Sequence, residues 1–221
     1  MSKKITVFTG HYGSGKTEIA INFALAEAAK GKKTVICDMD VVNPYFRTKD
    51  AQKRLQDAGI RVICPEFANS NVDLPSLPGE INAAFDGNYD SAILDLGGDD
   101  DGAVALGQYH ARLQKSDYEM LVVANLKRPL TETRQEIVDM VHAIEQASRL
   151  TATALINNTN ISYETTTEIL LENAQELEDA AKELGIPVRF YTGVRDVVAN
   201  LPGELEDKAF ELTLNLNPEW L

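Results

Sequence analysis

Apolar runs and helical stretches alternate along this chain of 221 residues. Runs rich in Val, Ile or Leu without strict alternation predict strands that are covered on both faces, and they lie at 5–9, 33–38, 60–64, 91–95, 119–124, 151–156 and 187–191. Apolar positions at helical spacing predict helices at 17–30, 47–58, 101–115, 131–148 and 164–184. This alternation predicts one α/β domain over residues 1–221, with a doubly wound, mostly parallel sheet of about seven strands.

The predicted helix 164–184 has the clearest apolar stripe of the chain. Gly185 follows it as a C-cap, and Thr165 with Glu168 has the spacing of a capping box at its start. The stripe consists of Leu170, Ala174, Leu177, Ala181 and Leu184. The pattern therefore predicts one continuous helix here.

A glycine-rich segment follows the first predicted strand. Residues 10–17 read Gly-His-Tyr-Gly-Ser-Gly-Lys-Thr and fit G-x-x-x-x-G-K-[ST], the phosphate-binding P-loop. Such a loop needs a strand before it and a helix after it, because its backbone N–H groups and the helix N-terminus together bind phosphate. Lys16 is expected to reach the β- and γ-phosphates, and Thr17 to ligate Mg²⁺. The predicted nucleotide-binding residues here are Gly10, Gly13, Ser14, Gly15, Lys16, Thr17 and Glu18.

Carboxylates follow two other predicted strands, where an open α/β sheet binds its ligands. Asp95 ends an apolar strand and is assigned as the Walker B residue that holds Mg²⁺, with Gly98 as the γ-phosphate sensor. Asp38 is expected to join the Mg²⁺ ligands. Asp40 then orients or deprotonates the attacking water or substrate hydroxyl. The alternative is that Asp38 or Asp40 only caps a loop, since Asp is favoured there.

Composition and charge narrow the class of partner. The chain is 44% hydrophobic and 25% charged, as in ordinary globular proteins, and carries no apolar run long enough for a membrane span. Its start lacks a signal-peptide core, which predicts a cytoplasmic protein. A net charge of −13 without a basic patch predicts that it binds neither nucleic acid nor membrane. Cys37 and Cys64 form no C-x-x-C pair and are expected to be buried free thiols.

With these residues in place, the chain resembles the MinD/ParA/Mrp group of P-loop NTPases, in the SIMIBI class. The P-loop, the Asp38-Met39-Asp40 strand end, and Asp95 with Gly97-Gly98 carry the resemblance. The stretch from Asp38 to Arg47 further resembles a bacterial subgroup labelled MinD-like or CobQ/CobB-like. The resemblance implies ATP and Mg²⁺ as cofactors. It also implies that Asn157, or alternatively Asn158, hydrogen-bonds the adenine.

One position departs from this group. Many members carry a signature lysine after the first P-loop glycine, which reaches the partner's ATP in a dimer, whereas this chain has His11. A neutral imidazole does not supply the same fixed charge, so an ATP-sandwich dimer is left open. Arg47 is a candidate arginine finger, in cis or in trans. The alternative is that Arg47 is only a surface residue at a helix start.

Two functions compete at this point. The leading hypothesis is a Mg²⁺-dependent ATPase that acts as a switch on a partner protein or as a homodimer. The alternative is an ATP-dependent ligase or kinase of the dethiobiotin-synthetase or cobyrinate-synthase type, with loop 65–80 and residues 43–47 lining a substrate pocket. A nucleotide-binding module without hydrolysis is disfavoured, because Lys16, Thr17, Asp38 and Asp95 supply the full Mg²⁺·ATP machinery.

Overall fold

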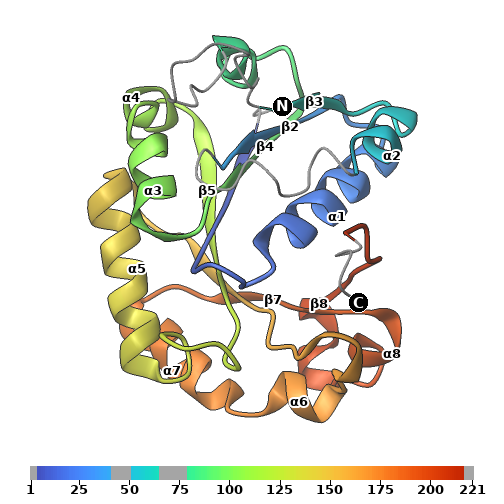
Figure 1. Cartoon of the computed structure of the whole chain (residues 1–221), viewed down its shortest axis with the longest axis vertical. Helices are drawn as coiled ribbons and strands as arrows, with labels where there is room; N and C mark the ends of the chain where they lie inside the picture. The colour runs from blue at the N-terminus through green and yellow to red at the C-terminus, as the bar shows by residue number, and fades with distance from the viewer. Residues whose placement is uncertain (1–3, 41–50, 65–78, 217–221) are drawn as a thin grey trace, which may run out of the picture.

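Eight parallel strands form one sheet in the order β3-β2-β4-β1-β5-β6-β7-β8 (Figure 1). The structure is a computed structural model that describes residues 4–40, 51–64 and 79–216. The strands are β1 (Lys4–Thr9), β2 (Thr34–Met39), β3 (Arg61–Ile63), β4 (Ser91–Leu96), β5 (Asp117–Ala124), β6 (Ala154–Asn157), β7 (Val188–Gly193) and β8 (Ala209–Glu211). This parallel sheet with helices on both faces confirms the predicted α/β fold.

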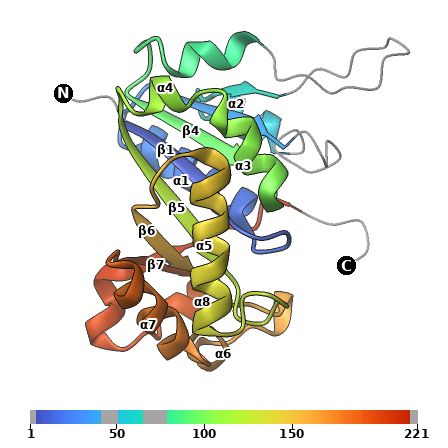
Figure 2. The ribbon, with the colours of Figure 1, turned by 90° about the vertical axis from the view of Figure 1, so that its left-hand side faces the viewer.

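Eight α-helices and three 3₁₀ turns connect the strands within the described residues. The α-helices are α1 (Lys16–Ala29), α2 (Gln52–Asp57), α3 (Asp99–Gly107), α4 (His110–Leu113), α5 (Arg134–Ser148), α6 (Thr167–Leu171), α7 (Ala174–Leu184) and α8 (Arg195–Val198). The 3₁₀ turns are η1 (Gly79–Ala84), η2 (Ser162–Glu164) and η3 (Gly203–Lys208). Figure 2 shows α5 running along one face of the sheet, with α3 beside it.

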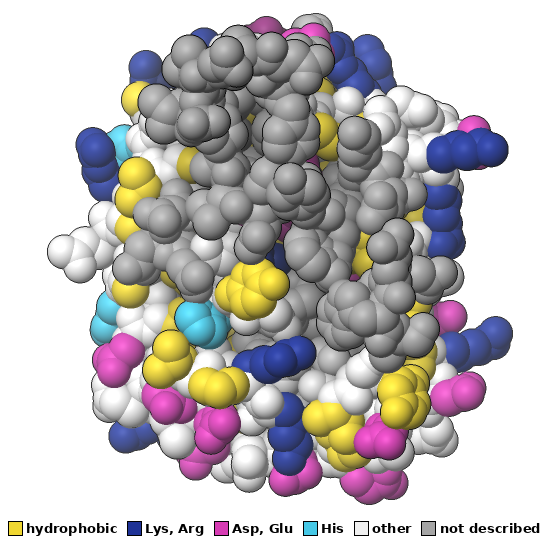
Figure 3. Space-filling view, viewed as in Figure 1, with side chains coloured by type: hydrophobic (Ala, Val, Ile, Leu, Met, Phe, Trp, Pro, Cys, Tyr) yellow, Lys and Arg dark blue, Asp and Glu magenta, His cyan; other side chains and the backbone are white. Residues whose placement is uncertain are grey.

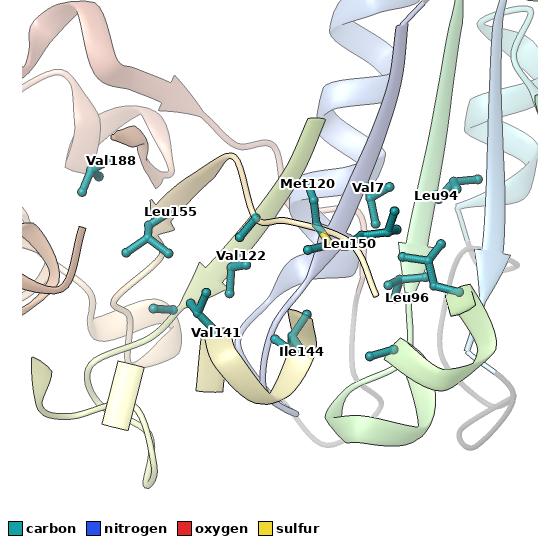
Figure 4. Close-up of a cluster of buried hydrophobic side chains, with 14 of the residues drawn as sticks. Val7, Leu94, Leu96, Met120, Val122, Val141, Ile144, Leu150, Leu155 and Val188 are labelled. Atoms are coloured by element: carbon teal, nitrogen blue, oxygen red, sulfur yellow. The ribbon is translucent and has the colours of Figure 1, made fainter. Parts of the chain in front are cut away.

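Two apolar clusters, one on each face, hold the helices to the sheet. Alternate residues of each strand enter opposite clusters, since successive side chains of a strand point to opposite faces. The cluster under α3, α5 and α7 contains Val7, Leu94 and Val122 (Figure 4). The other lies under α1 and α2 and contains Ile36 and Ile93. By the same alternation, the residues two positions beyond Ile36 and Ile93 lie on the α1 face of the sheet.

The last strand is the one that the sequence pattern missed. β8 has three residues, Ala209–Glu211, and pairs with β7 at the edge of the sheet. None of its residues is fully buried. A short, half-exposed edge strand needs no apolar run, so the signal that predicts the buried strands is absent here.

The predicted helix 164–184 is two helices, α6 and α7. Asn173 has a left-handed backbone with φ 58° and separates them. The predicted capping box is also wrong. Thr166 caps α6 by accepting a hydrogen bond from the backbone N–H of Ile169, whereas the Thr165 hydroxyl donates to the Ser162 carbonyl at 2.6 Å. The apolar stripe is correct on both pieces, which is why it suggested one helix.

Two other predicted helices also differ in extent. The predicted helix 101–115 is divided into α3 and α4. Of the predicted helix 47–58, residues 47–50 lie outside the described residues and α2 covers 52–57. The predicted helices 17–30 and 131–148 correspond to α1 and α5, which begin and end within a few residues of the expected positions.

Candidate functional site

The P-loop connects β1 to α1, as its sequence pattern requires, and its glycines are structurally necessary. Gly10 has φ +141°, and a Cβ there would lie 2.3 Å from the carbonyl oxygen of Val123. Gly15 has φ +85° at the N-cap of α1, and a Cβ would lie 2.3 Å from Nδ2 of Asn158. Only glycine fits these backbone conformations and contacts. Both positions therefore fix the path of the loop.

Residues at the ends of β6 and β7 hold this loop in place by hydrogen bonds. Nδ2 of Asn158 donates a hydrogen bond to the Ser14 carbonyl at 2.7 Å, and its Oδ1 accepts one from the Thr192 hydroxyl at 2.6 Å. Both polar ends of the Asn158 side chain are thereby occupied. The sequence placed Asn158 only as an alternative base contact, and it gave no role to Thr192. Their common signal is a polar residue at the end of a buried strand.

Two carboxylates face each other beside the P-loop. Asp38 on β2 and Asp95 on β4 are register partners, and the alternation of the strands puts both on the α1 face. Asp95 is 2% exposed, Asp38 7% and Lys16 6%. The Thr17 hydroxyl hydrogen-bonds to Asp95, and the Lys16 ammonium interacts with both carboxylates. Four of the predicted site residues are thus brought together.

Burial and mutual repulsion disfavour two negative charges here. Burial, and then the nearby Asp95 carboxylate, raises the pKa of Asp38 to about 8. Burial also raises the pKa of Asp95 to about 7, opposed by the Lys16 ammonium and the Thr17 hydrogen bond. Without a further cation, the pair therefore retains a proton near neutral pH. A bound divalent cation would favour the ionised carboxylates instead.

The donor set fits Mg²⁺. Oδ1 of Asp95 is fully buried and has no hydrogen-bond partner among the described residues, although buried polar atoms are nearly always partnered. Mg²⁺ prefers oxygen ligands and is held by one or two carboxylates together with substrate phosphates. Asp95, Asp38 and the Thr17 hydroxyl are the residues that would hold it. The predicted metal ligands therefore converge on one side of the P-loop.

The segment after β4 packs against both the P-loop and the end of β2. A Cβ on Gly98 would lie 2.8 Å from Cα of Tyr12, and one on Gly97 would lie 2.9 Å from Oδ1 of Asp40. The backbone N–H of Asp40 donates to Oδ1 of Asp38 at 3.0 Å. This arrangement places Asp40 and Gly98 at the site, and their chemical roles stay predictions.

The side chain of Asn157, the predicted base contact, forms hydrogen bonds within the protein. Its side chain is fully buried, with Nδ2 donating to the Leu170 carbonyl at 3.2 Å. Its Oδ1 accepts from the backbone N–H of Thr159 at 3.0 Å and from the Thr159 hydroxyl at 2.7 Å. The base contact stays a prediction, and it requires at least one of these bonds to be exchanged. Arg47 and residues 65–78 lie outside the described residues.

The Glu18 side chain is hydrogen-bonded to the end of the described chain. Its Oε1 accepts hydrogen bonds from the backbone N–H and Nδ2 of Asn215 at 2.8 and 2.6 Å, and its Oε2 accepts one from Leu216 N–H at 3.1 Å. Its predicted nucleotide contact stays a prediction. Nothing in the local sequence indicated the side-chain contact, because its partners lie almost 200 positions further on.

Replacing Glu18 by alanine is expected to lower the free energy of unfolding by about 1.5–3 kcal/mol, because the bonds that it accepts are charge-assisted. Urea unfolding of the nucleotide-free protein measures the change. Glu204→Ala is the matched control, since Glu204 is exposed on η3, and it is expected to shift stability by less than about 0.5 kcal/mol. Equal effects of the two substitutions would show that Glu18 does not anchor residues 215–216.

The cysteines and the surface charges (Figure 3) show no feature that points to a second kind of site in the described residues. Both cysteines are free; Cys37 is buried as predicted, and Cys64 is only partly buried. On the face shown in Figure 3, acidic and basic side chains of the described residues are interspersed rather than gathered by sign. Within the described part of the chain, no helix has the length and apolar character needed to cross a bilayer.

Comparison with known proteins shows the fold. No family model matches the chain, and no curated protein does. Among solved structures, chloroplast FtsY from Physcomitrella patens matches with a TM-score of 0.58 and 16% identity, over 86% of this chain and 58% of that one. Cell division protein FtsY from Thermotoga maritima matches with a TM-score of 0.53 and 20% identity, over 84% and 60%.

A third match is the signal recognition particle receptor FtsY from Elizabethkingia anophelis in complex with GDP. Its TM-score is 0.53 at 16% identity, over 86% of this chain and 57% of that one. The chain thus spans about three fifths of the length of these structures. At such identities the likeness establishes the P-loop NTPase fold. The MinD/ParA/Mrp subgroup that the sequence resembles stays a prediction.

Proposed function

We propose that this protein binds Mg²⁺ with a nucleoside triphosphate, hydrolyses it slowly, and acts as a nucleotide-dependent switch. One observation carries the proposal. Asp95, with an unpartnered buried oxygen, lies beside Asp38, Lys16 and Thr17 at the start of the P-loop helix. A triphosphate with its cation is the ligand that uses all four groups together. A structural ion pair would not leave the Asp95 oxygen unpartnered.

Each residue then has a distinct task. The Lys16 ammonium and the P-loop N–H groups neutralise the charge of the β- and γ-phosphates. Bound Mg²⁺ supplies further neutralisation of the phosphate oxygens. Asp40, beside Gly97, orients the attacking water and accepts its proton. Gly98 presents its backbone N–H to the γ-phosphate.

The switch follows from the contact between Gly98 and Tyr12. Because these backbones touch, a movement of the segment after β4 on loss of the γ-phosphate changes the P-loop surface at Tyr12. The Tyr12 side chain is 54% exposed. An exposed aromatic side chain at that position suits recognition by a partner protein or a second copy of the chain.

ATP is the expected nucleotide, because the chain lacks the N-K-x-D pattern of guanine recognition after β6. The Elizabethkingia anophelis FtsY structure contains GDP, which makes GTP the competing choice. Competition of ATP and GTP for a fluorescent nucleotide analogue separates them. A preference for ATP of about tenfold or more is expected, since one buried hydrogen bond to the base is worth that much.

A cavity beside the P-loop bears on the ligase or kinase alternative. It has a volume of about 460 Å³ and is lined by His11, Leu130 and Ile144, together with Glu136 and Asp139. This volume suits a small molecule. Its two carboxylates oppose an anionic acid as phosphoryl acceptor. This cavity therefore does not suit such an acid, and residues 43–47 and 65–78 of the predicted substrate pocket lie outside the described residues.

Phosphate release with Mg²⁺·ATP, with and without small carboxylic acids, tests the proposal, alongside light scattering with a non-hydrolysable analogue. Slow release without any acid, and a change of oligomeric state with the analogue or a partner, are expected. Release that requires an added acid would replace the switch by the ligase or kinase. Absence of binding by both ATP and GTP would reject the nucleotide site itself.

Gly98→Ala is expected to slow hydrolysis by about tenfold or more and to weaken nucleotide binding by less, because the added methyl displaces the γ-phosphate donor and presses on the P-loop backbone at Tyr12. Single-turnover phosphate release and equilibrium binding give the two quantities. Gly203→Ala is the control, since a Cβ there meets no atom within 4 Å. Unchanged hydrolysis in Gly98→Ala would remove Gly98 from the proposed mechanism.

A further inference from the structure

Arg128, a residue without a predicted role, lies against the P-loop at Gly13. Nε and Cζ of Arg128 are 3.6 and 3.7 Å from the position that a Cβ on Gly13 would occupy. Gly13 itself has φ +76°, so the loop is in a left-handed conformation there and carries no side chain. The guanidinium thus lies within ordinary van der Waals distance of the position that a Cβ on Gly13 would take.

The loop that carries Arg128 is firmly anchored. It follows β5, and Oδ1 of Asn125 accepts from Lys127 N–H at 3.0 Å and from Asn160 N–H at 3.2 Å. The Thr131 hydroxyl donates to the carbonyls of Asn125 and Arg128, at 2.7 and 3.0 Å. The backbone of Arg128 is therefore fixed by the loop itself and by the loop after β6. This placement does not depend on a contact of the guanidinium.

The guanidinium of Arg128 forms no ion pair or hydrogen bond within the described ranges 4–40, 51–64 and 79–216. Among the other described arginines, Arg61, Arg112 and Arg134 each pair with a carboxylate, at 2.7, 3.6 and 3.2 Å. Arg149, Arg189 and Arg195 have no ion pair within these ranges, so the position of Arg128 at the P-loop is what distinguishes it. The chain carries 34 Asp and Glu residues against 21 Lys and Arg, so acidic partners are abundant. An unpaired guanidinium held at a phosphate-binding loop is arranged for an anion.

The strand order places this cation along the path of a bound nucleotide. β5 lies between β1, which leads into the P-loop, and β6, whose end carries the predicted base-contacting residues. A nucleotide with its phosphates in the P-loop and its base near the end of β6 passes the end of β5. Arg128 is at that end, on the side of Gly13.

We propose that Arg128 contacts the bound nucleotide in cis and is a binding residue of the site. The inference rests on the proposed function, since it takes the P-loop to bind a nucleotide. The planar guanidinium donates two parallel hydrogen bonds to phosphate oxygens, and its place beside Gly13 puts it at the phosphate-binding loop. Arg128 thus supplies from within the chain a phosphate-binding cation, the role for which Arg47 was the predicted candidate.

Equilibrium binding of ATP, ADP and adenosine to Arg128→Ala tests the contact. The expected result is a loss of about tenfold or more for ATP and ADP, as for the removal of a charge-assisted hydrogen bond, and little change for adenosine. Arg128→Lys keeps the charge but lacks the planar fork, so its expected affinity is intermediate. The loss is expected to shrink at high salt, which a purely structural role would not produce.

Two control variants make the outcomes distinct. Arg134→Ala removes an exposed arginine nearby that pairs with Glu183, and it is expected to bind ATP within about twofold of the wild type. If Arg128→Ala binds ATP as the wild type does while Lys16→Ala does not bind, the role of Arg128 is overturned and the nucleotide site stands. If the wild type binds no nucleotide, the proposed nucleotide site and the proposed role of Arg128 are both overturned. An equal loss for adenosine would overturn the phosphate contact.

Discussion

Lys16→Ala is expected to abolish the stabilisation of the fold by Mg²⁺·ATP. At a ligand concentration about a hundred times the dissociation constant, binding stabilises the native state by about 2.7 kcal/mol, and this increment disappears when affinity falls more than about a hundredfold. Lys16 is 6% exposed, and its ammonium is the cation that offsets both Asp38 and Asp95. The change in melting temperature on adding Mg²⁺·ATP measures the effect.

Lys115→Ala is the matched control, because Lys115 is an exposed lysine near the N-terminal ends of the strands. It is expected to keep the full nucleotide response. If Lys16→Ala were stabilised as strongly as the wild type, the P-loop would not be the binding site. A loss of response in both variants would point to general charge rather than to the site.

Asp95→Asn is expected to raise the stability of the nucleotide-free protein at about pH 8 and to remove its response to Mg²⁺. The pKa values of Asp38 and Asp95 in the fold, about 8 and about 7, lie well above the ordinary value of 3.8. Between that value and pH 8 the native state binds more protons than the unfolded chain, so its stability falls as pH rises. The neutral amide removes one ionising group and its repulsion of Asp38.

Urea unfolding at about pH 5, 6.5 and 8 measures this linkage, since the slope reports the difference in bound protons. The wild type is expected to lose stability over this range, and Asp95→Asn to lose clearly less. Mg²⁺·nucleotide should restore the free energy of unfolding of the wild type at about pH 8 and leave that of Asp95→Asn unchanged. A wild-type stability that rises with pH would contradict the raised pKa of both carboxylates.

The sequence predicted the elements whose signal is local. Buried parallel strands need apolar runs, so such runs alone predicted the strands that lead into the P-loop, Asp38 and Asp95. The fold then brings Asp38 and Asp95 together, because their strands are neighbours with β4 between β2 and β1. The central part of the candidate site was therefore predictable from strand ends and one motif.

Other features depend on contacts between segments that are distant in the sequence. Asn158 braces the P-loop 144 positions away, and Glu18 holds Asn215 across 197 positions. Arg128 had only a weak local signal, a basic residue just beyond the strand that neighbours β1. Pattern and propensity describe neighbours along the chain, so they could not reveal these partners. The short edge strand β8 was not predicted for a related reason. Its extended conformation depends on pairing with β7 and not on an apolar run of its own.

The most direct test of the nucleotide site is calorimetric titration of the wild-type protein with a non-hydrolysable ATP analogue, with and without Mg²⁺. The site predicts one nucleotide per chain and an affinity that Mg²⁺ raises by about tenfold or more, since the cation relieves the repulsion of two buried carboxylates. It also predicts proton release near neutral pH, because the pKa values of about 7 and about 8 fall when the cation binds. Binding without a Mg²⁺ effect, or no binding of either the ATP or the GTP analogue, would contradict it.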